Sequence, residues 1–232
     1  MVKIMKRIFS GRWPILVLAV IALVLMLVLG VQTEQSPIRL APLVISVGVM
    51  LLNSGANRYA FLAGGLNSIL YGLSFLHYGL YGSMLQAFAI SCPVQIATFF
   101  LWSKRGYKSS TVFRAMSARL RVLTAALSLV GYAGYLAVSL HIGASSPYVD
   151  SAIFISGIVL PILSLCSFRE YAYIQPFTAL LSPIVYITML KENPDISVYL
   201  VYSIYSYVCI IYQLLSVRRF SKEQEGERVE NA

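Results

Sequence analysis

Long apolar stretches separated by short polar segments dominate this chain. They cover residues 14–31, 37–54, 60–78, 82–102, 120–141, 150–167, 172–189 and 196–217. Each has about the length of a helix that crosses a hydrocarbon core of roughly 30 Å. None alternates polar and apolar residues as a β-barrel strand does. The pattern therefore predicts an all-α integral membrane protein with eight transmembrane helices.

Two parts of the chain resemble each other at a separation of about 110 residues. Pro37 and Pro147 follow matching serines, and Tyr59 and Tyr171 stand at matching helix starts. Each part holds three apolar stretches, and one further stretch lies between them. A single intervening helix gives both parts the same orientation, as in transporters built from parallel repeats. The sequence thus predicts two parallel three-helix repeats joined by a linker helix, plus an extra N-terminal helix, with chance similarity as the alternative.

These elements divide the chain into five parts. They are an N-terminal tail with the extra helix, the first repeat, a basic loop with the linker helix, the second repeat and a disordered tail, at 1–35, 36–105, 106–145, 146–219 and 220–232. The tail is expected to be disordered because residues 221–232 are charged and contain no aromatic residue. The first apolar stretch exceeds the core of a signal peptide, so we expect a retained helix.

The charged residues indicate an orientation in the membrane. The chain has a net charge of +9, yet only 12% of its residues are charged. With eight spans and the N-terminus inside, every Lys and Arg except Arg39 and Lys191 falls on the inner side. This is the positive-inside pattern of membrane proteins. It predicts cytoplasmic termini, and it assigns the positive charge to anionic lipid rather than to nucleic acid.

Acidic residues are absent from the middle of the predicted spans. Those outside the C-terminal tail fall at or near span ends: Glu34, Asp150, Glu170, Glu192 and Asp195. Carriers driven by protons or sodium commonly use buried acids or histidines, so their absence favours facilitated diffusion. The chain also lacks GxSxG and HExxH motifs and paired carboxylates. We therefore expect no enzymatic activity, no metal site and no cofactor.

Neutral polar and aromatic residues follow one face of four predicted helices. The four stripes are Asn67, Tyr71, Ser74 and Tyr78; Ser91, Gln95, Thr98 and Trp102; Gln175, Thr178, Ser182 and Tyr186; and Tyr202, Ser206, Cys209 and Gln213. Such faces either join helices through hydrogen bonds or line a wet pathway. The amides Asn67, Gln95 and Gln175 are assigned to the pathway. Tyr78 and Trp102, near helix ends, are expected to be interface anchors.

Prolines interrupt several of these spans. Pro93, Pro161, Pro176 and Pro183 all fall inside predicted helices. Proline removes a backbone N–H and loosens the helix around it. The positions predict hinges around a substrate pathway; the alternative is the general abundance of proline in membrane helices.

Short motifs in the first repeat carry a family resemblance. They read Asn57-Arg58-Tyr59, Gly64-Gly65-Leu66-Asn67-Ser68-Ile69-Leu70-Tyr71-Gly72, Gly79-Leu80-Tyr81-Gly82, Pro93-Val94-Gln95 and Trp102-Ser103-Lys104-Arg105. This set resembles the PnuC family of bacterial transporters for nicotinamide riboside. The resemblance implies a SWEET-like order of three, one and three helices, facilitated diffusion, a homotrimer and the bacterial inner membrane.

The second repeat departs from that family at one place. The family usually carries a tryptophan-rich motif near Arg169, whereas the chain has no tryptophan between Glu170 and Gln175. Tyr171 and Tyr173 are the candidates to replace the stacking surface, and Gln175 the polar contact. Thiamine, riboflavin, a deoxynucleoside or a sugar therefore stay open as substrates. A membrane sensor or assembly subunit is the alternative without transport.

The predicted substrate site lies between the two repeats. Its residues are Asn67, Tyr71, Gln95, Tyr171, Gln175, Tyr186 and Tyr202. Amides and hydroxyls would bond the ribose and the carboxamide, and aromatic faces would stack on the ring.

Overall fold

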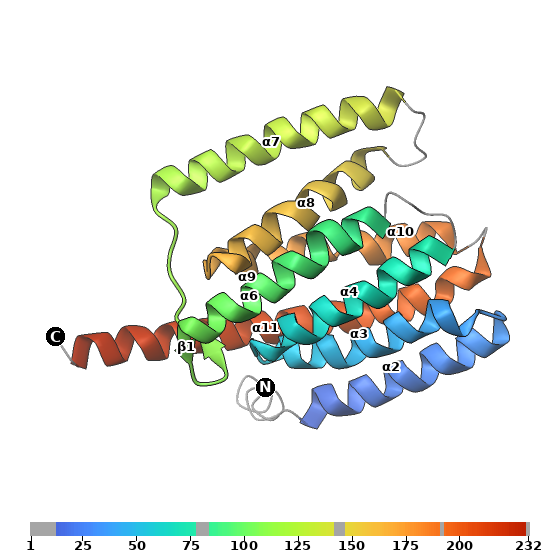
Figure 1. Ribbon diagram of the computed structural model, residues 1–232, viewed down its shortest axis with the longest axis horizontal. Coiled ribbons are helices and arrows are strands. Elements are labelled where there is room, and N and C mark those ends of the chain that lie inside the picture. Colours follow the sequence, from blue (N-terminus) through green and yellow to red (C-terminus); the bar gives the residue numbers. More distant parts are fainter. Residues whose placement is uncertain (1–12, 78–83, 142–146, 191–192, 231–232) are drawn as a thin grey trace, which may run out of the picture.

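The computed structural model describes residues 13–77, 84–141, 147–190 and 193–230, which form a helical bundle with one small hairpin (Figure 1). The elements are α2 (Trp13–Gln32), α3 (Pro37–Ser54), α4 (Tyr59–His77), the π-helix η1 (Gln86–Ser91), α6 (Cys92–Lys104), β1 (Gly106–Tyr107), β2 (Ser110–Thr111), α7 (Ala118–His141), α8 (Pro147–Leu165), α9 (Glu170–Ala179), α10 (Leu181–Met189), the 3-10 helix η2 (Pro194–Ile196) and α11 (Ser197–Glu230).

The all-α membrane fold expected from the sequence is confirmed. Within the described residues, seven helical segments are long and apolar enough to cross a membrane. The remaining predicted span, 82–102, corresponds to η1 and α6, which follow each other without interruption. The basic residues of 1–12, together with Tyr78 and Lys191, fall outside the described residues.

Six of the helical segments close into a ring. The first helix set consists of α3, α4 and η1–α6, and the second helix set consists of α8, α9–α10 and α11. Within each set, every helix contacts the next one along the chain. Between the sets, α6 contacts α8 and α11 contacts α3. The last helix of each set therefore lies against the first helix of the other. Such an exchange is expected for two sets related by an axis along the membrane normal.

The turn after the first helix is the same in both sets. Ala56 and Ser167 adopt left-handed conformations, with φ of 48° and 59°. The Ala56 N–H donates to Asn53 O at 2.8 Å, and the Ser167 N–H donates to Ser164 O at 2.8 Å. Both residues are buried. Two separate parts of the chain thus adopt the same turn geometry. These turns follow α3 and α8 and reverse the direction of the chain at the same end of the ring.

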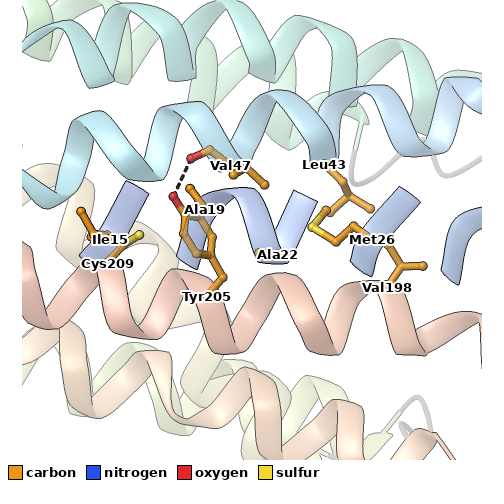
Figure 2. Packing of buried hydrophobic residues seen from close by; sticks show 9 residues of the cluster. All are labelled: Ile15, Ala19, Ala22, Met26, Leu43, Val47, Val198, Tyr205 and Cys209. Carbon is orange, nitrogen blue, oxygen red and sulfur yellow. Dashed lines mark hydrogen bonds between the residues drawn. The ribbon is translucent and has the colours of Figure 1, made fainter. Parts of the chain in front are cut away.

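The extra helix α2 lies in a groove between α3 and α11 (Figure 2). Ala19 and Ala22 face this groove and are buried. Small residues allow membrane helices to approach closely, which lipid alone would not drive. Beside them, the Tyr205 hydroxyl donates to Val47 O at 2.9 Å and joins α11 to α3. The helix outside the repeats is therefore a packed part of the bundle.

The predicted disorder of the C-terminal tail is wrong. Helix α11 continues to Glu230, well past the predicted span. Gln224 is buried; its Nε2 donates to Thr111 O at 2.9 Å and its Oε1 accepts from the Phe113 N–H at 3.0 Å. Lys108 binds Glu223 at 2.7 Å, and this hydrogen bond holds the pKa of Lys108 above its usual value. The charged tail is ordered because the hairpin β1–β2 supplies its partners. The other domain boundaries stay a prediction.

The environment of Trp102 also differs from the one predicted. It is not an interface anchor, because its side chain is fully buried. Its ring packs edge-on against Phe61, Phe113 and Tyr171, with centroid distances of 4.6, 5.5 and 6.2 Å. Its Nε1 donates to Ser164 O at 2.8 Å. The end of α6 is covered because Phe113, in the segment that follows β2, packs against Trp102.

This environment predicts a large effect of removing the indole. Trp102→Ala should lower the free energy of unfolding by about 3–5 kcal/mol, because it opens a cavity and frees a buried carbonyl. Trp13→Ala is the control, since Trp13 is 74% exposed and its loss should cost less than about 0.5 kcal/mol. Thermal unfolding in detergent compares the two. Equal midpoints for both variants would contradict this account of Trp102.

Candidate functional site

A cavity of about 180 Å³ lies inside the ring of six helices. Both helix sets line it, through α3, α4, η1, α6, α8, α9 and α11. Its polar wall consists of neutral side chains: Asn53, Ser91, Gln95, Thr98, Ser164, Tyr171, Gln175 and Gln213. None of the described lining residues is charged. The cavity is the feature that a pathway between the two sets requires, and a sensor or assembly subunit with sealed polar stripes would lack it.

Gln95 enters this cavity from α6 because α4 leaves room for it. A Cβ atom on Gly64 would collide with the Gln95 carboxamide oxygen. The Gln95 Nε2 donates to Ser68 Oγ at 3.0 Å, and Ser68 donates to Gly64 O at 3.0 Å. One turn of α4 thus provides both the space for Gln95 and the bond that orients it.

Tyr171 and Asn53 are joined by Gln213 at the side of the cavity nearer the hairpin. The Gln213 Nε2 donates to Asn53 Oδ1 at 2.9 Å and to the Tyr171 hydroxyl at 3.1 Å. Tyr171 is 2% exposed and Gln213 is 1% exposed. One amide from α11 therefore connects α3 of the first set with α9 of the second.

Three polar atoms in the cavity wall have no hydrogen-bond partner in the described part of the protein. They are Gln175 Oε1, Gln213 Oε1 and Ser164 Oγ. A buried acceptor without a partner costs about 1–3 kcal/mol. These atoms have almost no accessible surface in this structure, and a ligand whose hydroxyl or amide donors reached them would remove this cost. The wall is therefore chemically suited to a molecule that forms several hydrogen bonds.

Two helix irregularities lie near prolines, and one of them lines the cavity; the predicted hinges stay a prediction. The π-helix η1 ends two residues before Pro93, which cannot donate a backbone hydrogen bond. Two residues of η1, Ile90 and Ser91, line the cavity. The helical segment formed by α9 and α10 is interrupted at Leu180. Pro183 removes the bond that would reach the carbonyl of Ala179 and crowds that carbonyl. Helices α8 and α9 continue through Pro161 and Pro176.

The structure brings three of the seven predicted site residues to the cavity wall: Gln95, Tyr171 and Gln175. The other four do not line it. The Asn67 Nδ2 donates to Pro42 O at 3.0 Å and to Ser46 Oγ at 2.8 Å, which joins α4 to α3. The Tyr71 hydroxyl lies 3.1 Å from the same Ser46 Oγ.

Tyr186 and Tyr202 lie nearer the ring end opposite the hairpin. Tyr186 contacts the Tyr199 ring at 6.0 Å, and Tyr202 packs against the core shared by α2, α3 and α11. At the same end, the Arg39 Nε donates to the Tyr199 hydroxyl at 2.7 Å and Gln35 Nε2 donates to Asp195 O at 2.6 Å. The first bond connects α3 to the start of α11, and the second connects the segment before α3 to η2. Substrate contact by Asn67, Tyr71, Tyr186 and Tyr202 stays a prediction.

Five polar lining residues were not assigned to the site from the sequence: Asn53, Ser91, Thr98, Ser164 and Gln213. Ser91, Thr98 and Gln213 stand on the predicted polar stripes, and that periodicity could have identified them. Asn53 stands at the end of α3, outside any stripe. Its place in the wall depends on the contact between α3 and α11, which no local pattern contains.

The fold and the cavity define a class of protein, a polytopic membrane protein with a polar cavity between two three-helix sets. Residues 36–219 match the family model described as nicotinamide mononucleotide transporter. The chain therefore belongs to this transporter family, whose members are transport proteins rather than enzymes.

A curated relative and a solved structure agree with this assignment. The nicotinamide riboside transporter PnuC of Neisseria mucosa is 24% identical over 174 residues, which are 72% of this chain and 66% of the relative. The chain thus matches just under two thirds of that protein's length. The crystal structure of the vitamin B3 transporter PnuC superposes with a TM-score of 0.72 at 20% identity, over 90% of this chain and 92% of that one. The structural likeness supports the fold.

The bond between Gln213 and Tyr171 can be measured through stability. Gln213→Leu should lower the free energy of unfolding by about 1–3 kcal/mol, because it leaves the buried Tyr171 hydroxyl and Asn53 without their partner. Tyr171→Phe combined with Gln213→Leu should cost less than the sum of the two single variants, by about 0.5 kcal/mol or more. Gln86→Leu, at an exposed position of η1, is the control and should be close to neutral. Strict additivity of the two variants in detergent would refute the coupling.

Proposed function

We propose that the protein carries nicotinamide riboside across the membrane by facilitated diffusion through the central cavity. The observation that carries the proposal is the set of three unpaired polar atoms, on Ser164, Gln175 and Gln213. The ribose hydroxyls and the carboxamide of the riboside supply donors and an acceptor for such a wall. Tyr171 and Phe61 add aromatic surface, which attracts the positive charge of the pyridinium ring.

The wall favours the riboside over the mononucleotide named in the family description. A nucleotide adds a phosphate, which proteins bind through arginine, lysine or helix N-termini. The described lining residues include no basic side chain. Placing a phosphate dianion among neutral groups would leave its charge uncompensated. The riboside therefore fits this wall better.

The same lack of charge supports passive transport. Coupled carriers use buried acids or histidines to bind the driving ion. Glu170, the nearest acid along α9, starts that helix and is not among the described lining residues. The concentration gradient of the substrate would then be the driving force.

The assembly and orientation belong to the same proposal. The positive-inside pattern supports a bacterial inner-membrane protein with cytoplasmic termini, which places the hairpin β1–β2 in the cytoplasm. The resemblance to PnuC supports a homotrimer and a SWEET-like relation between the two helix sets. Crosslinking of the purified protein in lipid tests the number of subunits.

Removing the Gln175 side chain tests the substrate site. Gln175→Ala should raise the Kd for nicotinamide riboside about tenfold, which is the equivalent of 1.4 kcal/mol. It should not lower thermal stability, because it removes a buried acceptor that has no partner in the described protein. Calorimetry on purified protein and uptake into proteoliposomes provide the two measurements. Gln32→Ala, at an exposed position of α2, is the matched control.

The substrate itself is tested with a panel on the unaltered protein. Nicotinamide riboside should bind more tightly than nicotinamide mononucleotide, thiamine, riboflavin and glucose. A tighter fit for any other member would replace the riboside as substrate. An unchanged Kd in Gln175→Ala would instead remove that residue from the site and leave the transport class intact.

Gly64 offers a second test from the opposite wall. Gly64→Ala places a methyl group where the Gln95 carboxamide lies, so Gln95 must leave its bond to Ser68. A displaced Gln95 would no longer bond the substrate from this wall, and the loss of one hydrogen bond, worth about 0.5–1.5 kcal/mol, should raise the Kd about two- to tenfold. Gly48→Ala is the control, because its Cβ meets no atom within 4 Å. Equal affinities in the two variants would show that the position of Gln95 does not matter.

A further inference from the structure

Helix α7 stands apart from the ring, with α8 as its main packing partner (Figure 1). Its contacts with α8 include the Tyr135 and Phe154 rings, stacked at 4.0 Å. Large apolar side chains on the rest of its surface are exposed, with Leu129 at 69% and Val130 at 71%. Beside the contact lies a groove of about 510 Å³ between α7, α8 and α9, here called the α7 groove. It is lined by Leu129, Tyr132, Ile155, Val159 and Ile174, among others.

Something apolar must fill the α7 groove. Its walls lie on spanning helices, so water would find few polar partners there. An empty groove would lose dispersion contacts along three helices. The occupant is therefore an acyl chain or a side of another protein.

The polar end of the α7 groove decides between these occupants. Arg121 and Glu170 both line it and are 2.8 Å apart. Glu170 Oε1 also accepts from the Met116 N–H at 3.0 Å, whereas Glu170 Oε2 is buried and has no partner in the described part of the protein. The Arg121 side chain is 54% exposed, and a guanidinium with five donors keeps several free for another acceptor. Arg114 and Arg119 add positive charge to the 114–121 segment, which contains no acid.

The length of the α7 groove matches one leaflet. Arg121 and Tyr132 line its two ends along α7 and are eleven residues apart in sequence. At 1.5 Å per residue they are separated by about 16 Å along the helix. Half of a hydrocarbon core is about 15 Å. An acyl chain whose head group binds Arg121 would therefore reach the far end of the groove.

We infer that the α7 groove binds an anionic phospholipid, with its phosphate at Arg121 and an acyl chain along α7. The basic 114–121 segment calls for a negatively charged partner, and a second copy of this chain is the alternative occupant that the test below distinguishes. An anionic head group compensates that charge, as in other basic pockets between membrane helices. The lipid would join α7 to α9, beside the α8 contact.

Native mass spectrometry of the full chain tests this inference with two added lipids of equal acyl chains, phosphatidylglycerol and phosphatidylcholine. Wild-type protein should retain phosphatidylglycerol more tightly. Ala125→Phe fills the α7 groove and should abolish retention of both lipids. Arg121→Gln should weaken phosphatidylglycerol about fivefold, the equivalent of about 1 kcal/mol per basic residue, and leave phosphatidylcholine unchanged.

Two matched controls separate the groove from general effects. Ala126→Phe adds the same ring to an exposed neighbour that is not among the described lining residues, and Lys222→Gln removes an exposed charge from α11. Both should bind lipid like wild type. Equal retention of the two lipids by wild type would overturn the inference, as would unchanged phosphatidylglycerol binding in Ala125→Phe. Loss of an oligomer in Ala125→Phe, with lipid binding intact, would identify a second copy as the occupant.

Discussion

In a bilayer no water replaces a missing hydrogen-bond partner, so the backbone groups at helix ends inside the bundle must be satisfied by protein. Helices α3 and α8 meet this constraint in the same way. The Ser54 carbonyl accepts from Ser216 Oγ at 2.9 Å, and the Ser164 carbonyl accepts from Trp102 Nε1 at 2.8 Å. Each donor comes from the last helix of the opposite set. The exchange fixes α11 against α3 and α6 against α8, and these two contacts close the ring.

The cavity depends on that closure. Trp102 and its aromatic neighbours fill the ring end next to the hairpin, and Gln213 spans from α11 to both Asn53 and Tyr171. Away from this end the helices are less regular, with the π-helix η1 in one set and the break at Leu180 in the other. A tightly bonded end and two loosened helices together leave space between the sets. At the opposite end, the hydrogen bond of Arg39 connects α3 to the start of α11, and that of Gln35 connects the segment before α3 to η2.

The sequence was most informative where the membrane imposes a local rule. Span lengths follow from the thickness of the hydrocarbon core, and the amide positions Gln95 and Gln175 follow from helical periodicity. Burial of Trp102 was not predictable in this way, because it depends on Phe113 and Ser164, which lie in other elements. Order in the tail depends likewise on the pairing of Gln224 with Thr111 and Phe113, far away in the chain. Composition describes residue 224 as polar and says nothing of its partner.

A neutral cavity wall limits how the protein can select its substrate. Without charge, discrimination must come from matching donors to acceptors, and a site with unpaired buried acceptors rejects molecules that cannot donate to them. In the proposed transport function, Gln213 would both orient the wall and accept a hydrogen bond from the substrate, because its Nε2 is held by two protein groups while its Oε1 has no partner in the described protein. An acceptor fixed in this way does not reorganise when substrate enters, so its hydrogen bond is gained without loss of side-chain entropy. The same bond must break for release, and a few neutral bonds are weak enough to permit it. A passive carrier needs such moderate binding, since no coupled ion supplies energy to expel the substrate.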